Sequence, residues 1–315
     1  MNEAPIRTLT VAASYGLCNR LRVLLSGMAL AEATGRRFTM FWPRTKACAA
    51  AFTDLFATPW PVREAAAQEV ESLRQTARLE TSTPDLLAAD VADLRIWSAG
   101  WLLAPERFPA HRRLMQRSAE LLALLQPVRE LQERVEAFQT DSFRSHMIGV
   151  HLRRADMQFL SPIAAANTHC ALAVVDAYLA QVPDAGILLC TDDGAIHQHT
   201  GKPLPAEGVR AKFLHRYRDR VIFTLPRSFD RREPKAIQDA LVELWLLRQT
   251  DCFAGTVGSS FSELAAFGRT VPVTLCQSQH PLRHLLPLRY WLRGERPLKW
   301  LARYYWHLIR PRGAR

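Results

Sequence analysis

Polar side chains gather at the end of one predicted strand. The apolar run 148–152 carries His151 and leads directly into Arg153, Arg154 and Asp156. Ligands of α/β sheets bind beyond the carboxyl ends of strands, and packing alone does not explain charged groups there. Two adjacent guanidiniums offer planar, bidentate and permanently charged donors, which suit a phosphate. The segment therefore indicates a phosphate-bearing ligand, with solvated or locally paired arginines as the alternative.

Three further clusters lie where a predicted strand ends. Gly16 and Asn19 belong to a strand-to-helix turn, whose free backbone N–H groups suit an anion at the start of a helix. Asp192 is the first of two carboxylates that suit sugar hydroxyls, although capping of the next helix is the simpler interpretation. Ser259 and Ser260 lie among small residues that suit a pyrophosphate, and an ordinary serine N-cap explains them equally well. Each cluster is unspecific alone, but all of them follow strands.

Strands and helices alternate along most of the chain. The hydrophobic pattern predicts strands at residues 9–13, 37–42, 92–97, 147–152, 186–191, 220–225, 252–256 and 271–276. Helices are predicted at residues 17–34, 65–76, 115–138 with an interruption at Pro127, 171–181, 236–249 and 261–267. This alternation is typical of parallel sheets covered by helices, and it predicts two α/β units that meet near residue 145.

The composition is that of a folded protein with a substantial core. Of the 315 residues, 48% are hydrophobic and 23% are charged, which fits one large domain or two of ordinary size and excludes a disordered chain. No run of about 18 uncharged apolar residues is present, so no transmembrane helix is expected. The N-terminal segment lacks the layout of a secretory signal, and we expect a cytoplasmic protein.

Six cysteines are scattered along the chain without a Cys-x-x-Cys pair, at positions 18, 48, 170, 190, 252 and 276. Several of them lie inside apolar runs that are predicted strands. We therefore predict buried thiols in a reducing cytoplasm rather than disulfides or zinc ligands. No cluster of His, Cys and Asp has the spacing of metal ligands, so we expect no metal site.

Most of the positive charge lies at the C-terminal end. The chain carries a formal charge of +11, and segment 281–315 holds eight arginines and one lysine against one glutamate, a net charge of +8. Tyrosines and tryptophans are interleaved with these cations, as in helices that lie on anionic membrane surfaces. A helix that packs on the N-terminal unit with a solvated basic face is the main alternative. Nucleic acid is not expected as a partner, because no nucleic-acid-binding fold is recognisable.

These motifs and their order resemble those of the fucosyltransferase superfamily that contains the α1,6, protein O-linked and bacterial nodulation enzymes. The shared segments are GVHLRRAD at 149–156, LLCTDD at 188–193, ELWLLRQTDCFAGTVGSSFSELA at 243–265 and, less specifically, YGLCNRLRVLLSGMALAEATGRRF at 15–38. The resemblance implies a GT-B fold, in which two Rossmann-like domains face each other across a cleft. It implies an N-terminal acceptor domain at 1–145 and a C-terminal GDP-sugar-binding domain at 146–280, followed by the basic aromatic tail at 281–315.

The resemblance also implies a reaction, the metal-independent and inverting transfer of fucose from GDP-fucose to a hydroxyl group of a glycan. GDP-fucose is the donor substrate, no cofactor is expected, and GDP-mannose is the alternative donor. A tail bound to the inner face of the plasma membrane would bring the enzyme close to envelope or lipid-linked glycans. A non-catalytic protein that binds nucleotide sugars or anionic surfaces is the alternative class.

Residue by residue, the resemblance assigns roles around the donor. Arg153 would hold the β-phosphate, His151 would contact the nucleotide and Asp156 would lie near the sugar. Ser260 would bind the pyrophosphate, although an extra glycine before it makes Ser259 an alternative. Without a metal, fixed cations and N–H dipoles must stabilise the negative charge that builds up on the departing GDP.

Glu243 occupies the position at which the family binds guanine through a carboxylate, usually an aspartate. An unpaired carboxylate among apolar neighbours is costly, and the N1–H and N2 amine of guanine would satisfy it. Asp239 lies one helical turn earlier and is expected to substitute for Glu243 or to assist it.

The motifs leave open which residue is the base that accepts the proton of the acceptor hydroxyl. The α1,6 enzymes carry a glutamate five residues beyond the aspartate of the motif, where this chain has Ser161. Asp156 is the first candidate for the base and Glu263 is the second. A dissociative reaction with little participation of a base is the alternative.

Overall fold

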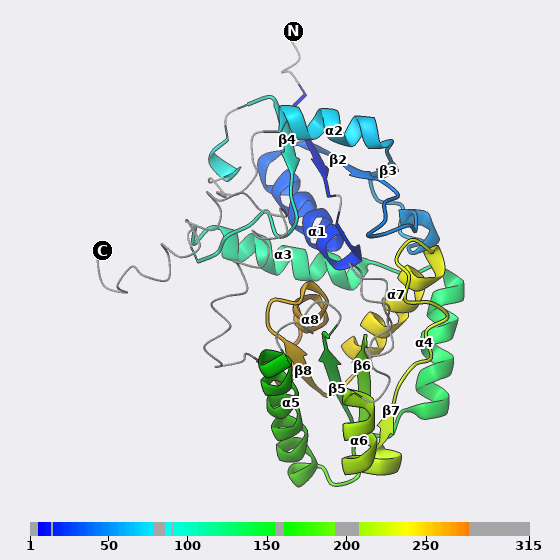
Figure 1. Cartoon of the computed structure of the whole chain (residues 1–315). Helices are drawn as coiled ribbons and strands as arrows, with labels where there is room; N and C mark the ends of the chain where they lie inside the picture. The colour runs from blue at the N-terminus through cyan, green and yellow to red at the C-terminus, as the bar shows by residue number, and fades with distance from the viewer. Residues whose placement is uncertain are drawn as a thin grey trace.

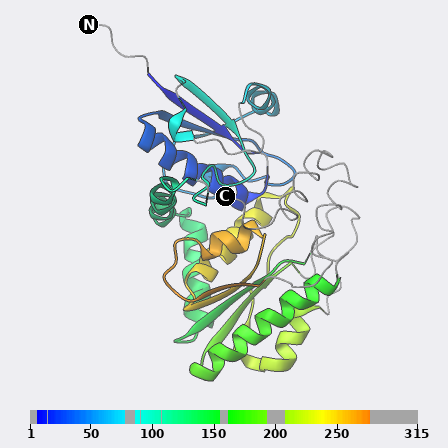
Figure 2. The ribbon, with the colours of Figure 1, turned by 90° about the vertical axis from the view of Figure 1, so that its left-hand side faces the viewer.

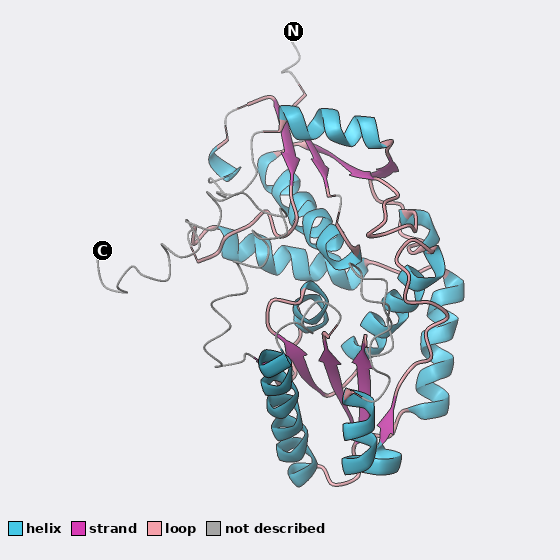
Figure 3. Cartoon of the chain, in the orientation of Figure 1, coloured by secondary structure: helices cyan, strands magenta, loops and turns pink. Residues whose placement is uncertain are grey.

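Two parallel sheets form the core of the protein (Figures 1 and 3). The first has four strands, in the order β3 (Val62–Glu64), β2 (Arg37–Trp42), β1 (Thr8–Ala12) and β4 (Asp93–Trp97). The second has five, in the order β7 (Val221–Ile222), β6 (Gly186–Thr191), β5 (Met147–Leu152), β8 (Cys252–Thr256) and β9 (Val273–Cys276). Every neighbouring pair of strands is parallel. The predicted α/β class with two parallel sheets is confirmed.

The computed structural model describes residues 6–13, 15–77, 86–89, 91–106, 108–154, 161–192 and 208–276. Asp156 and the tail at 281–315 lie outside this part. The helices are α1 (Leu17–Thr34), α2 (Ala67–Thr76), α3 (His111–Leu124), α4 (Arg129–Ser142), α5 (Ser161–Gln181), α6 (Val209–Tyr217), α7 (Pro234–Arg248) and α8 (Ser260–Ala266), with 3-10 turns at Phe52–Asp54, Leu86–Ala88 and Arg218–Arg220. Among the described helices, none is both long and apolar enough to cross a membrane.

Helix α1 follows the prediction and fixes the first strand-to-helix turn. Most of its apolar residues are buried, and it ends at Gly35, which adopts the left-handed conformation with a φ of 58°. Arg20 is fully buried and donates hydrogen bonds to the carbonyl oxygens of Tyr15 at 2.6 Å and Pro43 at 2.5 Å. Its guanidinium therefore ties the turn before α1 to the loop after β2.

The second sheet is covered by helices on both faces. Figure 2 shows α5 and α6 on one face and α7 and α8 on the other. All residues of β6 and β8 are buried, as expected for apolar parallel strands between two helical layers. This layering leaves the strand ends as the places where polar side chains of the second sheet reach the surface.

Helices also join the two sheets. Helix α8 contacts α1, where Arg22 forms an ion pair with Glu263. Helix α4 packs against α7, where Arg134 Nη2 lies 2.6 Å from Asp239 Oδ1. One apolar cluster includes buried residues of both halves. Because α4 precedes residue 145 and yet packs on the second half, the domain boundary at residues 145 and 146 stays a prediction.

Most elements agree with the predictions within a few residues, but α5 begins ten residues before the predicted residue 171, and α6 was missed. Its buried side chains are Val209, Phe213 and Tyr217, spaced four residues apart in an otherwise polar segment. This spacing is a helical signal, but three residues make it a weak one. The strand predicted at 220–225 is shorter than expected, because only Val221–Ile222 pairs with β6. The short β3 was also missed.

The prediction of thiols alone is wrong for one pair of cysteines. Cys170 of α5 and Cys276 at the end of β9 form a disulfide, with their Cα atoms 5.7 Å apart. The other four cysteines are free and buried, as predicted. The pair is separated by 106 residues in the sequence, and it meets only because α5 packs against β9. The spacing of the two cysteines in the sequence does not predict this contact.

Candidate functional site

The candidate site lies where the strands of the two sheets end. The sheets run toward one another, so that their carboxyl ends face across the middle of the molecule (Figure 1). The facing edges hold the ends of β5, β6 and β8 from the second sheet and the turn between β1 and α1 from the first, which are the four places where polar clusters were predicted. The carboxyl edge of parallel strands is the usual place of ligands in α/β proteins.

His151 joins two of the predicted clusters. Its Nδ1 lies 2.6 Å from the Ser262 hydroxyl, and its ring centroid lies 4.6 Å from that of Phe261. The same hydroxyl accepts a hydrogen bond from the backbone N–H of Thr256 at 2.9 Å. Burial lowers the pKa of His151 to about 3, and the charge of Arg153 adds to the effect. The imidazole is therefore uncharged at neutral pH and links the end of β5 to α8.

The two adjacent arginines have different surroundings. The backbone N–H of Arg154 donates to Asp192 Oδ1 at 2.5 Å, and its guanidinium donates to the Thr168 hydroxyl of α5 at 3.5 Å. The charge of Arg153 acts on the Cys18 thiol of α1 as well as on His151. Burial raises the pKa of that thiol to about 12, and Arg153 is one of the cations that oppose the rise. Arg154 therefore lies toward α5, whereas the Arg153 backbone N–H donates to the Thr256 hydroxyl of β8 at 3.2 Å.

The turn before α1 faces an arginine that the sequence analysis missed. A Cβ added to Gly16 would lie 3.7 Å from Arg231 Nη1 and 3.6 Å from the carbonyl oxygen of Ala47. Asn19 supports the turn, because its backbone N–H donates to the Gly16 carbonyl at 3.1 Å. The Asn19 Oδ1 accepts from Arg22 Nη2 at 2.6 Å. The turn thus brings Gly16 next to a cation from the loop between β7 and α7.

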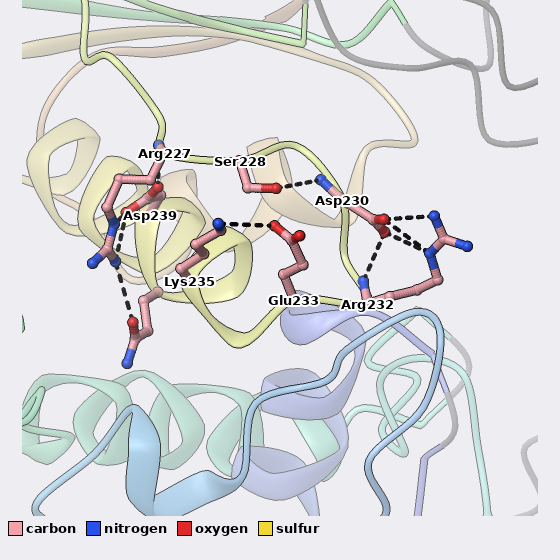
Figure 4. A network of polar contacts seen from close by, with 8 residues as sticks. Arg227, Ser228, Asp230, Arg232, Glu233, Lys235 and Asp239 are labelled. Carbon is pink, nitrogen blue, oxygen red and sulfur yellow. Dashed lines mark hydrogen bonds and ion pairs between the residues drawn. The ribbon is translucent and has the colours of Figure 1, made fainter.

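Short-range polar contacts fix the loop that carries Arg231 (Figure 4). Asp230 accepts from the backbone N–H of Arg232 at 3.0 Å and pairs with its guanidinium at 2.6 Å. The Arg232 guanidinium lowers the pKa of Asp230 to about 2. The Ser228 hydroxyl accepts from the backbone N–H of Asp230 at 3.1 Å. In the sequence this loop is a run of charges without a motif, so nothing singled out Arg231.

The two serines of the downstream motif have different roles. Ser259 is the N-cap of α8 and is buried, and its Oγ accepts from the backbone N–H of Ser262 at 3.5 Å. The capping interpretation therefore holds for Ser259. Ser260 is the first residue of α8 and is partly exposed, so it is the better candidate for contact with a ligand. Gly258, the extra residue before them, has a φ of 73°, a left-handed conformation that favours glycine.

Glu243 of α7 lies in a partly buried polar cluster. The Thr224 hydroxyl donates a hydrogen bond to its Oε1. Burial raises the pKa of Glu243 to about 7, while the Thr224 bond and the charge of Arg210 oppose the rise. The carboxylates of Asp239 and Asp192 add to the rise. Glu243 is therefore a partly buried acid with a perturbed pKa beside the end of β7, as a ligand-reading group is expected to be.

Two arginines engage the Asp239 carboxylate. It is buried and accepts from Arg134 Nη2 at 2.6 Å, from the Arg227 backbone N–H at 2.6 Å and from Arg227 Nε at 3.0 Å. Figure 4 shows the contact with Arg227. These partners occupy both carboxylate oxygens. Asp239 therefore holds α4 and the loop after β7 together, and its role beside a guanine base stays a prediction.

Comparison with solved structures gives the fold. NodZ fucosyltransferase from Bradyrhizobium matches with a TM-score of 0.55 at 19% identity, over 87% of this chain and 97% of that one. A NodZ α1,6-fucosyltransferase soaked with GDP-fucose matches with a TM-score of 0.55 at 18% identity, over 85% and 94% of the two chains. FUT1 of Arabidopsis thaliana in complex with GDP matches with a TM-score of 0.52 at 13% identity, over 89% and 72%. No protein-family model and no curated protein matches the sequence.

The chain has the GT-B fold of these fucosyltransferases. In this GT-B protein the second candidate base, Glu263, is engaged by the ion pair with Arg22, and its side chain is 32% exposed. The pair lies between α1 and α8, so Glu263 helps to join the two sheets. Ser161 begins α5, and the first candidate, Asp156, lies outside the described residues. Within those residues, no group of three His, Cys, Asp or Glu side chains is arranged to hold a metal ion.

Proposed function

We propose that the protein transfers fucose from GDP-fucose to a hydroxyl group of a glycan, with inversion at the reacting carbon. The observation that carries the proposal is the arrangement of Arg153 and Glu243 at one edge of the second sheet. A cation that suits a phosphate follows β5, and a carboxylate that suits guanine lies beside the end of β7. The likeness of the fold to fucosyltransferases supports this pairing.

In the proposed reaction, the acceptor oxygen bonds to C1 of fucose while the bond from C1 to the β-phosphate oxygen breaks. The electron pair of the broken bond goes to GDP, so negative charge grows on the diphosphate. Arg153 and the backbone N–H groups at Ser260 are the groups that we assign to stabilise this charge. The proton of the acceptor hydroxyl goes to a base, a role that we assign to Asp156.

The test is a turnover assay with purified protein. Thermal-shift measurements with GDP-fucose, GDP-mannose, GDP and UDP-sugars first identify the donor, because a ligand stabilises the folded protein that binds it. Release of GDP from the preferred donor is then measured with mixed glycan acceptors. We expect GDP-fucose to be consumed. Stabilisation by GDP-mannose alone would change the donor, and stabilisation without release of GDP would support a non-catalytic binding protein.

GDP binding is expected to strengthen up to about tenfold between about pH 6 and about pH 8. Glu243 must be ionised to accept hydrogen bonds from guanine N1–H and N2–H, and its pKa is raised to about 7. The folding stability of the ligand-free protein changes with pH in the opposite direction to the affinity for GDP. The stability that protonated Glu243 contributes is present below its ordinary pKa of 4.5 and is lost as the pH rises through about 7.

Calorimetric titrations with GDP and UDP over this pH range check the prediction. Both ligands carry the same titrating diphosphate, so a difference between their pH dependences comes from the base. Glu243→Gln should abolish the part of the pH dependence that is specific to GDP. An equal pH dependence for GDP and UDP in the unmodified protein would contradict the role of Glu243.

We also propose that segment 281–315 binds anionic membrane surfaces and brings the enzyme to envelope or lipid-linked acceptors. Its net charge of +8 and its interleaved aromatic residues support this role. Deletion of the segment is expected to abolish sedimentation with anionic liposomes, measured at low and high salt, and neutral liposomes are the control. Undiminished sedimentation of the shortened protein would refute the membrane role.

A further inference from the structure

A second polar group faces the cluster around Glu243. Arg210 lies in the first turn of α6, and its guanidinium carbon is 5.0 Å from the centroid of the Phe223 ring. Its Nε is buried and has no hydrogen-bond partner among the described residues. A buried N–H without an acceptor destabilises the folded protein, so such a group calls for an explanation. A ligand atom that accepts a hydrogen bond would supply one.

Arg210 and Glu243 act on the same small region. Phe223, on which Arg210 stacks, is followed by Thr224, which donates to Glu243. The charge of Arg210 also lowers the pKa of Glu243 against the effect of burial. Both charges act on the buried Cys190 thiol at the end of β6, whose pKa burial raises. A donor from α6 and an acceptor from α7 therefore lie around the same pair of strand ends.

This pair of groups matches one edge of one nucleobase. Guanine presents an acceptor at O6 followed by donors at N1 and N2. A carboxylate accepts from the two donors, and a guanidinium donates to the carbonyl oxygen. Adenine presents a donor where guanine has O6, and uracil presents a second carbonyl where guanine has its amine. A donor beside a carboxylate therefore distinguishes guanine from both.

We infer that Arg210 donates a hydrogen bond to O6 of the guanine base and completes the recognition that Glu243 begins. The inference rests on the proposed function, because it assumes a guanine nucleotide in this cluster. It adds a specificity-determining residue from the helix that the sequence analysis missed. Stacking on Phe223 fixes the guanidinium before the ligand arrives, which reduces the entropy lost on binding.

The test uses two analogues of GDP in calorimetric titrations of the full chain. 6-Thio-GDP replaces O6 by a weakly accepting sulfur, and inosine diphosphate lacks only the N2 amine that Glu243 would read. The unmodified protein is expected to bind GDP about tenfold more tightly than 6-thio-GDP, as for one hydrogen bond to a charged group. In Arg210→Met this preference should fall to about twofold or less, while the preference for GDP over inosine diphosphate persists.

Lys212→Met, which removes an exposed cation from the same helix, is the matched control and should keep both preferences. If Arg210→Met does not fold, as judged by circular dichroism, Arg210→Lys replaces it and must lower the preference for GDP over 6-thio-GDP. Retention of that preference in the Arg210 variant, or its absence in the unmodified protein, overturns the inference. A failure to prefer GDP over ADP and UDP would instead overturn the proposed function.

Discussion

Arg153→Ala is expected to reduce fucosyl transfer by about a hundredfold to a thousandfold, as the loss of one donor to a developing negative charge does elsewhere. The affinity for GDP should also fall, by about tenfold, because a charge-assisted contact with the diphosphate is lost. The effect on turnover exceeds the effect on binding because the charge on the diphosphate grows as the glycosidic bond breaks.

Two further variants sharpen this test. Arg154→Ala should reduce transfer less, because the Arg154 guanidinium points toward Thr168 of α5 and alanine keeps the backbone N–H that binds Asp192. Arg129→Ala removes a guanidinium that is 92% exposed on α4 and should leave turnover unchanged. The measurements are kcat and KM for GDP-fucose together with the Kd for GDP. Normal turnover in Arg153→Ala would refute the assignment of the phosphate site.

The second large effect concerns stability. Asp239→Ala is expected to destabilise the protein by about 3 kcal/mol, at the lower end of what the loss of one partner of a buried ion pair costs. The Asp239 side chain is 4% exposed, whereas Arg134 and Arg227 are 32% and 42% exposed, so water will partly solvate the arginines left behind. The preference for GDP over inosine diphosphate should not change, because Arg134 and Arg227 already engage the Asp239 carboxylate.

Denaturant unfolding with the free energy of unfolding as the readout checks this expectation. Glu133→Ala is the control, since it removes a carboxylate that is 57% exposed and paired on the surface of α4. Surface pairs contribute little, so its transition should stay close to that of the unmodified protein. If Asp239→Ala instead lost its preference for GDP at full stability, Asp239 would belong to the base site after all.

The sequence predicted the elements whose patterns are local. Apolar runs bounded by polar residues identified β5, β6 and β8, which end shortly before Arg153, Asp192 and the downstream serines. Because the carboxyl ends of parallel strands share one edge, the candidate site followed from the class of sheet. Gly35 marked the end of α1 by its left-handed conformation, which a sequence reveals through residue type alone.

The remaining features depend on contacts between distant segments. Arg153 and Arg154 are neighbours of the same type in the sequence, yet the guanidinium of Arg154 donates to Thr168 of α5, and the charge of Arg153 acts on His151 and Cys18. Arg231 reaches Gly16 only because the two sheets face each other. Asp239 and Glu243 share a helix and a residue class, but the position of α4 gives Asp239 two arginine partners and leaves Glu243 beside Thr224. No pattern within one segment encodes these differences.

The disulfide between Cys170 and Cys276 has a mechanical consequence. Strand β9 has four residues, lies at the edge of its sheet, and is the last described element before the tail. A pull on the chain beyond residue 276 would otherwise peel this strand away, one hydrogen bond after another. The disulfide transmits such a force to the long helix α5, which packs along the sheet and does not separate from it one hydrogen bond at a time. A C-terminal segment held at a surface can therefore bear tension without opening the sheet that would carry the donor.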